Sequence, residues 1–135
     1  CSFGLIEHFK DWEDVLLMHL KLLNKKGYLI IETPNLRSPI HYLIKFIFDP
    51  KAFKSHYLRA MNIKKWKEFC LKNNLEICKI GGIGKFYFWT GSNKLNSLQI
   101  FIKIVLRKIE PIINKLLNDD STFFSPIRGF IARLE

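Results

Sequence analysis

Glu7 and His8 stand side by side near the start of the chain, and they are the residues best suited to chemistry. A histidine exchanges a proton near neutral pH, so His8 is a candidate general base for a bound substrate. The competing interpretation gives both side chains a structural task, in which hydrogen bonds from them hold their loop in place. The sequence alone leaves both interpretations open.

Three other patterns that often carry chemistry are absent or incomplete. The glycine cluster at 81–84 lacks the Ser or Thr of a phosphate-binding loop, and a strand rather than a helix is expected to follow it. Cys1, Cys70 and Cys78 have no Cys-x-x-Cys spacing, so neither a zinc motif nor a disulfide framework is expected. Cys70 and Cys78 fall in apolar patterns and are expected to be reduced core residues, which favours a cytoplasmic location.

Composition is typical of a globular protein. The 135 residues, of which 48% are apolar, suffice for one domain and exclude a disordered chain. The formal net charge is +10, but the lysines are dispersed without a run of five like charges, so no nucleic-acid partner is expected. No uncharged stretch is long enough to span a bilayer. The chain opens in the middle of a pattern and without an initiator Met, from which we expect an N-terminal truncation.

The elements that must position Glu7 and His8 follow directly along the chain. A helix is expected over residues 11–26, and His19 lies within its apolar stripe as a boundary residue. The apolar face of this helix consists of Trp12, Val15, Leu16, Leu20 and Leu23. A continuous apolar run then begins at residue 28 and ends before Pro34, which is typical of a parallel strand covered on both faces.

The remaining pattern alternates between helices and strands. Helices are expected near 40–47 and 62–73, strands at 75–80, 85–89 and 127–134, and a turn or bulge at 81–84. A long amphipathic helix is expected at 96–117, with a kink or break at Pro111. Its apolar stripe consists of Leu98, Phe101, Val105, Ile109, Ile112 and Leu116. Helices that follow buried strands closely indicate an α/β sheet.

Two blocks of the sequence carry a resemblance to a known family. The first is Ser2-Phe3-Gly4-Leu5-Ile6-Glu7-His8-Phe9, and the second runs from Leu22 to Asn35 through Lys26-Gly27-Tyr28. Their order and spacing resemble class I S-adenosylmethionine-dependent methyltransferases, although Lys26 replaces the first of two usual glycines. The resemblance implies the C-terminal portion of a Rossmann-like three-layer α/β sandwich, namely strands five, six and seven with their flanking helices.

Within that fold, residues 1–135 would form a partial methyltransferase domain with an insert at about 36–61 and the long helix at about 96–117. The strand at 28–33 should be central and parallel to the segment before Phe3, with the strands at 75–80 and 127–134 antiparallel beside it. The family's glycine-rich loop and ribose-binding acid lie outside these residues. We therefore expect the chain to keep only the rim of the cofactor site and to bind S-adenosylmethionine weakly or not at all.

The resemblance also implies roles for individual residues. Ligands in an open α/β sheet lie beyond the carboxyl ends of the strands, although a plain strand-to-helix turn is the alternative. Cofactor contacts are expected from Ser2, Phe3, Gly4 and Glu7; substrate contacts from Asn35, Tyr57 and Arg59; and catalysis from His8 and His56.

A metal site is not expected from the sequence. Ubiquinone-pathway and small-RNA methyltransferases use a Glu and a His at the positions of Glu7 and His8 to bind a metal ion. A carboxylate three residues earlier normally completes that site, and the residue here is Gly4. Two candidate ligands do not make a magnesium site.

Two functions from different classes follow. The first is methyl transfer from S-adenosylmethionine to a small-molecule or sugar-like acceptor. The second is a non-catalytic binding or membrane-surface module, because the helix at 96–117 sets basic side chains against an apolar stripe. Peripheral membrane contact through this helix competes with packing of the helix on its own domain. No feature of the sequence indicates an oligomeric state.

Overall fold

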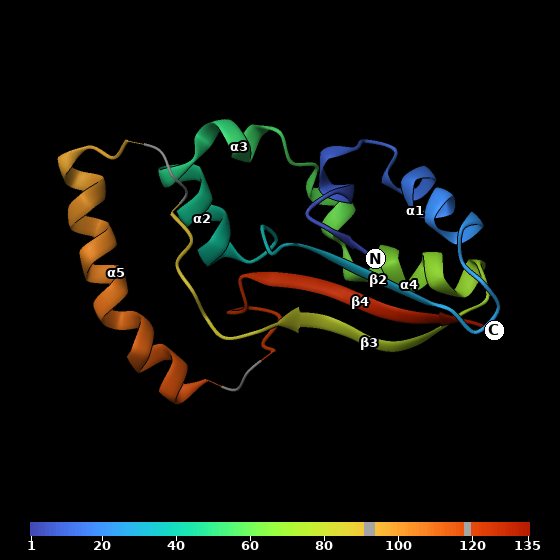
Figure 1. Ribbon diagram of the computed structural model, residues 1–135. Helices are drawn as coiled ribbons and strands as arrows, with labels where there is room; N and C mark the ends of the chain where they lie inside the picture. The colour runs from blue at the N-terminus through green and yellow to red at the C-terminus, as the bar shows by residue number, and fades with distance from the viewer. Residues whose placement is uncertain (91–93, 118–119) are drawn as a thin grey trace.

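The computed structural model describes residues 1–90, 94–117 and 120–135 and contains a four-stranded mixed sheet with helices around it (Figure 1). The strands are β1 (Ser2–Phe3), β2 (Tyr28–Pro34), β3 (Leu75–Ile83) and β4 (Ile127–Leu134), in the spatial order β1-β2-β4-β3. β1 is parallel to β2, whereas β4 is antiparallel to both β2 and β3. The expected strand directions are therefore confirmed, with β2 inside the sheet.

The main core lies between the sheet and two helices, α1 (Trp12–Lys21) and α4 (Ile63–Lys72). Leu29 and Ile31 of β2 lie opposite Ala132 and Phe130 of β4, and all four side chains are buried. Residues in the core include Ile6, Trp12, Leu16, Trp66, Phe69, Cys70 and Leu75. Alternate residues of β2 are exposed or only partly buried. The expected cover on both faces of this strand is thus not found in the described part of the chain.

The first helix is shorter than expected, because α1 ends at Lys21 rather than at residue 26. Residues 22–27 instead form a turn in which Lys26 has φ of 61°. Gly27 is needed there for space, since a Cβ atom at this position would lie 2.8 Å from the carbonyl oxygen of Asn24. His19 is partly buried and its Nδ1 contacts the carbonyl oxygen of Val15 at 2.7 Å, as expected for a boundary residue.

A second hydrophobic cluster joins helices α2 (Pro39–Phe48) and α5 (Ser97–Leu116), which lie side by side at one end of the molecule (Figure 1). The short helix α3 (Pro50–Lys54) follows α2, and two 3₁₀ turns, η1 (Ile6–His8) and η2 (Leu58–Met61), complete the helical elements among the described residues. Phe86 and Phe88 are buried in this second cluster.

The strand expected at 85–89 is wrong, because these residues form an extended segment outside the sheet. Side chains of α5 make hydrogen bonds to main-chain groups of this extended segment. Asn114 donates to the carbonyl oxygen of Phe86 at 2.9 Å, and Glu110 accepts from the amide of Phe88 at 3.3 Å. The bulge is also misplaced, since β3 continues through Ile83 and its register shifts between Ile77 and Lys79. Next to the shift, Cys78 is exposed rather than in the core.

Helix α5 begins with a capping box formed by Asn96 and Gln99 and continues through Pro111, so of the expected kink or break the break is not found. Pro111 and Arg107 are exposed, and water can therefore satisfy the carbonyl group that loses its helical partner. The helix packs on its own domain through Ile102, Leu106 and Ile113. The apolar stripe expected from the sequence is exposed instead: Leu98, Phe101, Val105, Ile109, Ile112 and Leu116.

No described helix combines the length and the apolar character that crossing a membrane requires.

Candidate functional site

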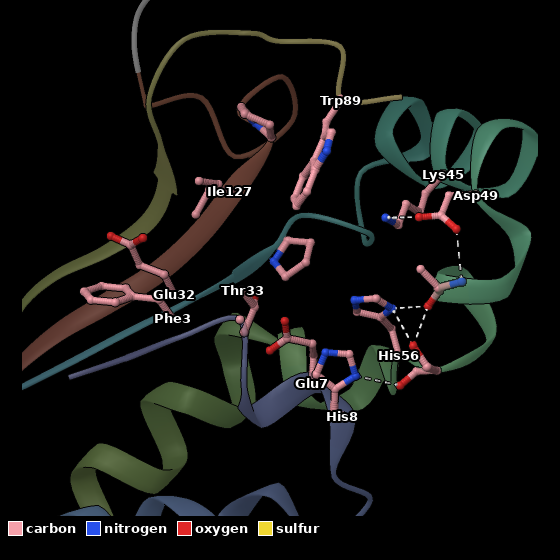
Figure 2. A pocket seen from close by; sticks show the side chains of 15 residues that line it. Phe3, Glu7, His8, Glu32, Thr33, Lys45, Asp49, His56, Trp89 and Ile127 are labelled. Carbon is pink, nitrogen blue, oxygen red and sulfur yellow. Dashed lines mark hydrogen bonds and ion pairs between the residues drawn. The ribbon is translucent and has the colours of Figure 1, made fainter. Parts of the chain in front are cut away.

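A cavity of about 500 Å³ opens at the carboxyl ends of β1 and β2 (Figure 2). Both strands end at the same edge because they are parallel. Its walls come from β1, η1, β2, the α2–α3 region, the segment after β3 and the start of β4. The lining residues are Phe3, Gly4, Glu7, His8, Glu32, Thr33, Pro34, Lys45, Asp49, Ala52, Ser55, His56, Trp89, Pro126 and Ile127.

The loop after β1 is held in place by main-chain hydrogen bonds. The amide of Gly4 donates to the carbonyl oxygen of Glu32 at 2.9 Å, and Gly4 adopts φ of 64°, a conformation that favours glycine. The chain then turns into η1, where Glu7 is 1% exposed and His8 is exposed. The amide of Tyr57 donates to the carbonyl oxygen of Glu7 at 2.7 Å, which joins the loop to the segment after α3.

That connection brings His8 and His56 together. Their ring centroids lie 4.7 Å apart, with the planes tilted by 45°. Nδ1 of His8 contacts the carbonyl oxygen of Ser55 at 3.2 Å, and Nδ1 of His56 contacts the carbonyl oxygen of Ala52. The other ring nitrogen of each histidine faces the side on which the Glu7 carboxylate lies (Figure 2).

Burial sets the electrostatics of this cluster. Burial raises the pKa of Glu7 above 4.5, although a main-chain hydrogen bond and the neighbouring His8 oppose the shift. Burial also lowers the pKa of His56 below 6.5, against the effect of its contact with Ala52. Oε2 of Glu7 is buried and has no hydrogen-bond partner among the described residues. Burial therefore disfavours the charged forms of Glu7 and His56, and the Glu7 carboxyl group carries an unsatisfied acceptor.

The opposite wall carries a cation beside an aromatic ring. Nζ of Lys45 lies 2.9 Å from Oδ2 of Asp49 and 5.0 Å from the centroid of the Trp89 ring. Oδ1 of Asp49 also accepts from the amide of Ala52 at 3.2 Å, at the start of α3. Lys45, Asp49 and Trp89 were not among the expected site residues. Helical spacing does place Lys45 and Asp49 on one face, but no local signal connects them to Trp89.

Five of the candidate residues line the cavity together, namely Phe3, Gly4, Glu7, His8 and His56. The others lie elsewhere. Ser2 is buried on β1, Tyr57 is exposed outside the cavity, and Arg59 borders a separate hollow with Lys10, Trp12, Glu13, Arg37, Asn62 and Lys65. Asn35 is fully buried, and its amide donates to the carbonyl oxygens of Thr122 at 2.9 Å and Ser125 at 2.8 Å.

The cavity offers a ligand both exposed main chain and an apolar surface. Gly4 presents main chain without a side chain, and the 60% exposed ring of Phe3 offers an apolar surface. Among the described residues, Glu7, His8 and His56 form the group able to hold a metal ion, since their ligand atoms all lie within 4.8 Å of one another.

No protein-family model matches the chain, and no curated protein is significantly similar to it in sequence.

Proposed function

We propose that the chain is the C-terminal part of a class I S-adenosylmethionine-dependent methyltransferase that acts on a small-molecule or sugar-like acceptor. One observation carries the proposal: a cavity at the carboxyl ends of two parallel strands is lined by the acid–imidazole pair Glu7 and His8. Ligands of open α/β sheets lie at this edge. The position of β4, antiparallel between β2 and β3, supports the assignment because the resembled family also closes its sheet with an antiparallel strand.

The side chains of the cavity have separate tasks in this proposal. Phe3 and Gly4 would lie against the cofactor, and the Trp89 ring would cover the acceptor. S-adenosylmethionine, when bound, supplies the methyl group from its sulfonium sulfur. The nucleophile must be held in line with that methyl group and must lose its proton. The free ring nitrogen of His8 or His56 would take that proton, because the Nδ1 atom of each ring contacts a main-chain carbonyl oxygen.

The remaining parts of such a cofactor site would have to come from other residues. A glycine-rich loop and a ribose-binding acid do not occur in the sequence of this chain. The outer edge of β1 has no partner strand in the described part of the chain, and that edge is where further parallel strands would pair.

The test begins with the coding sequence upstream of Cys1. A glycine-rich strand–loop–helix is expected there, and the longer chain should bind S-adenosylmethionine in a calorimetric titration. Residues 1–135 alone should bind it at least about 100-fold more weakly, since they provide only the rim of the site. Micromolar affinity of residues 1–135 would overturn this account of the site, and a longer chain without affinity would overturn the proposed function.

The longer chain also allows a test of His8. His8→Ala should lower methyl-transfer turnover at saturating cofactor by about 10²–10⁴-fold if the ring accepts the proton. His19→Ala is the control: it should cost about 1 kcal/mol of stability and little turnover, because its ring contacts the carbonyl oxygen of Val15 and does not line the cavity. A His8→Ala enzyme with normal turnover but a lower denaturation midpoint would support the structural role of His8.

We propose docking on an anionic membrane surface as a second candidate function, because α5 exposes its apolar stripe. Leu98, Phe101, Ile112 and Leu116 are 59–78% exposed along one side of the helix. At 3.6 residues per turn, Lys108 borders this stripe roughly 20° from Phe101. The helix carries four cations, Lys103, Arg107, Lys108 and Lys115, whereas its single acid, Glu110, accepts from the amide of Phe88.

This charge pattern favours anionic lipid over a second copy of the chain. A symmetric helix pair would bring the cations of both copies together without acids to neutralise them. Cations beside an apolar stripe suit an anionic lipid surface, where the ring of Phe101 would enter the interface.

Co-sedimentation with vesicles tests the docking. Binding is expected to vesicles that contain phosphatidylglycerol, with weaker binding to pure phosphatidylcholine and at high salt. The double variant Phe101→Glu and Ile112→Glu should abolish it. Leu71→Glu, at a 76% exposed leucine of α4, is the matched control and should bind normally. Equal binding to both lipids, or a stripe-dependent dimer in sedimentation without lipid, would contradict the proposal.

A further inference from the structure

We infer that Glu7, His8 and His56 form a binding site for a divalent transition-metal ion of the Zn²⁺ type. The ligand atoms of the three residues lie within 4.8 Å of one another at one wall of the cavity. They come from η1 and from the segment after α3. Tetrahedral zinc bonds of about 2.0–2.1 Å place ligand atoms about 3.3 Å apart, so the group must close by at most about 1.5 Å.

The contacts of the two histidines suit metal binding. A metal-bound histidine usually donates its other ring N–H group to a carbonyl or carboxylate oxygen, which fixes the tautomer and orients the ring. Nδ1 of His8 contacts the carbonyl oxygen of Ser55, and Nδ1 of His56 contacts that of Ala52. When Nδ1 donates in both rings, both Nε2 atoms carry a free lone pair on the side of Glu7 (Figure 2).

Glu7 provides a second, independent observation. The residue is 1% exposed, and Oε2 has no hydrogen-bond partner among the described residues. A buried polar group without a partner is destabilising, and more so when it is charged. A metal ion beside this oxygen would remove that cost and would keep the carboxyl group ionised.

The donor set selects the kind of ion. Two imidazole nitrogens and one carboxylate suit Zn²⁺ and its first-row neighbours, whereas Mg²⁺ prefers oxygen ligands. The carboxylate that could make the site richer in oxygen is missing, since Gly4 occupies the position three residues before Glu7. A Cβ atom at Gly4 would lie 3.5 Å from Oε1 of Glu7, so a carboxylate there would have been close enough to contribute.

Three protein ligands leave a fourth position of the ion open toward the cavity. With an ion bound, both Nε2 atoms are ligands and no longer accept a proton. If the proposed methyl transfer holds, an acceptor hydroxyl group at the open position would instead ionise more readily beside the ion and lose its proton to water. This role rests on the proposed function, but metal binding itself does not.

The experiment uses residues 1–135 without S-adenosylmethionine, so its outcome is independent of methyl transfer. Cys1 and Cys78 are exposed thiols and are first replaced by serine, because they would bind the probe themselves. After treatment with a chelator, the chain is titrated with Co²⁺, whose visible absorption reports its ligands, and Zn²⁺ is then added in competition. One equivalent of Co²⁺ should bind, Zn²⁺ should displace it, and millimolar Mg²⁺ should not.

Three variants and a control assign the ligands. His8→Ala, His56→Ala and Glu7→Gln should each weaken Co²⁺ binding by more than about 100-fold, since changes at second-shell partners alone typically cost 10–100-fold. His19→Ala should bind as the parent does, and circular dichroism should show that every variant is folded. A folded parent chain without a Co²⁺ spectrum, displacement by Mg²⁺, or unchanged binding in the folded His8→Ala and His56→Ala variants would overturn the inference.

Discussion

The main-chain amide of Tyr57 lies 2.7 Å from the carbonyl oxygen of Glu7 and donates a hydrogen bond to it. This bond joins two segments that are far apart in the sequence, and it lies directly between the neighbours that carry the imidazole rings. His8 follows Glu7, and His56 precedes Tyr57. The juxtaposition of the two rings thus depends on main chain rather than on side-chain packing.

Tyr57→Pro removes this amide hydrogen and should separate the two histidines. We expect a loss of about 0.5–1.5 kcal/mol in the free energy of unfolding, as for one hydrogen bond. Co²⁺ binding should weaken by about 10–100-fold, as for other changes that misorient a metal ligand. Tyr57→Ala keeps the amide and serves as the control in both denaturant titrations and Co²⁺ titrations. Equal Co²⁺ affinity in the two variants would show that the bond does not position the rings.

Gly129→Ala should be strongly destabilising, because a Cβ atom there would lie 2.2 Å from the carbonyl oxygen of Ile31 on the paired strand. Backbone cannot move away without breaking the β2–β4 ladder, so we expect a cost of about 3 kcal/mol. Gly84→Ala is the comparison: φ is 80° and no atom lies within 4 Å, so only backbone strain of about 1–2 kcal/mol is expected. Urea denaturation of both variants measures the two losses in the free energy of unfolding. A smaller loss for Gly129→Ala than for Gly84→Ala would contradict the prediction.

The three cysteines should react in two groups. Burial raises the pKa of the Cys70 thiol to about 11, whereas Cys1 and Cys78 are exposed. The thiolate is the reactive form, so at pH 8 Cys70 should be slow both chemically and sterically. A disulfide reagent should titrate two thiols rapidly in the native chain and the third only in denaturant. Cys70→Ser should give two thiols under both conditions; three fast thiols in the native parent chain would rule out the buried site.

His41 should make the stability of the chain depend on pH. It is 6% exposed, and burial lowers its pKa below 6.5, although its contact with the carbonyl oxygen of Phe124 opposes the shift. As the pH falls below 6.5, the unfolded chain therefore takes up this proton before the folded chain does. Stability is lost in that interval, with a slope of at most about 1.4 kcal/mol per pH unit.

His41→Gln isolates this effect, because glutamine can still donate to Phe124 but does not titrate. The parent chain should lose more stability than the variant between pH 7 and pH 5 in urea denaturation. His56 titrates in both proteins and cancels in the comparison. Parallel pH profiles would mean that His41 is protonated to the same degree in both states of the chain.

The sequence predicts those parts of the fold that depend on local chemistry. Asn62 caps α4, as its type and position before the helix indicate, whereas Asp11 makes no side-chain hydrogen bond at the start of α1. The apolar run after Gly27 forms the inner strand β2, and its direction relative to β1 and β4 is confirmed. Glu7 and His8 lie at the cavity because the turn after β1 opens at the carboxyl edge of the sheet.

The remaining features depend on distant partners. The aromatic run at 85–89 is typical of a strand, but Glu110 and Asn114 of α5 take the hydrogen bonds that a neighbouring strand would make. Helix α5 has two apolar sides, and the positions of α2 and of Phe86 and Phe88 decide which of them is buried. No local sequence pattern indicates that His56 lies beside His8, because the main-chain hydrogen bond between Tyr57 and Glu7 joins two separate segments.

The order of the strands has a consequence for synthesis on the ribosome. β4 is made after the other three strands, yet it lies between β2 and β3, which do not pair with each other. Until residues 127–134 leave the exit tunnel, β2 and β3 each present an open edge, and such edges recruit strands from other chains. A nascent chain paused before Ile127 would therefore need a chaperone at two separate edges, and a single late insertion would then close both of them.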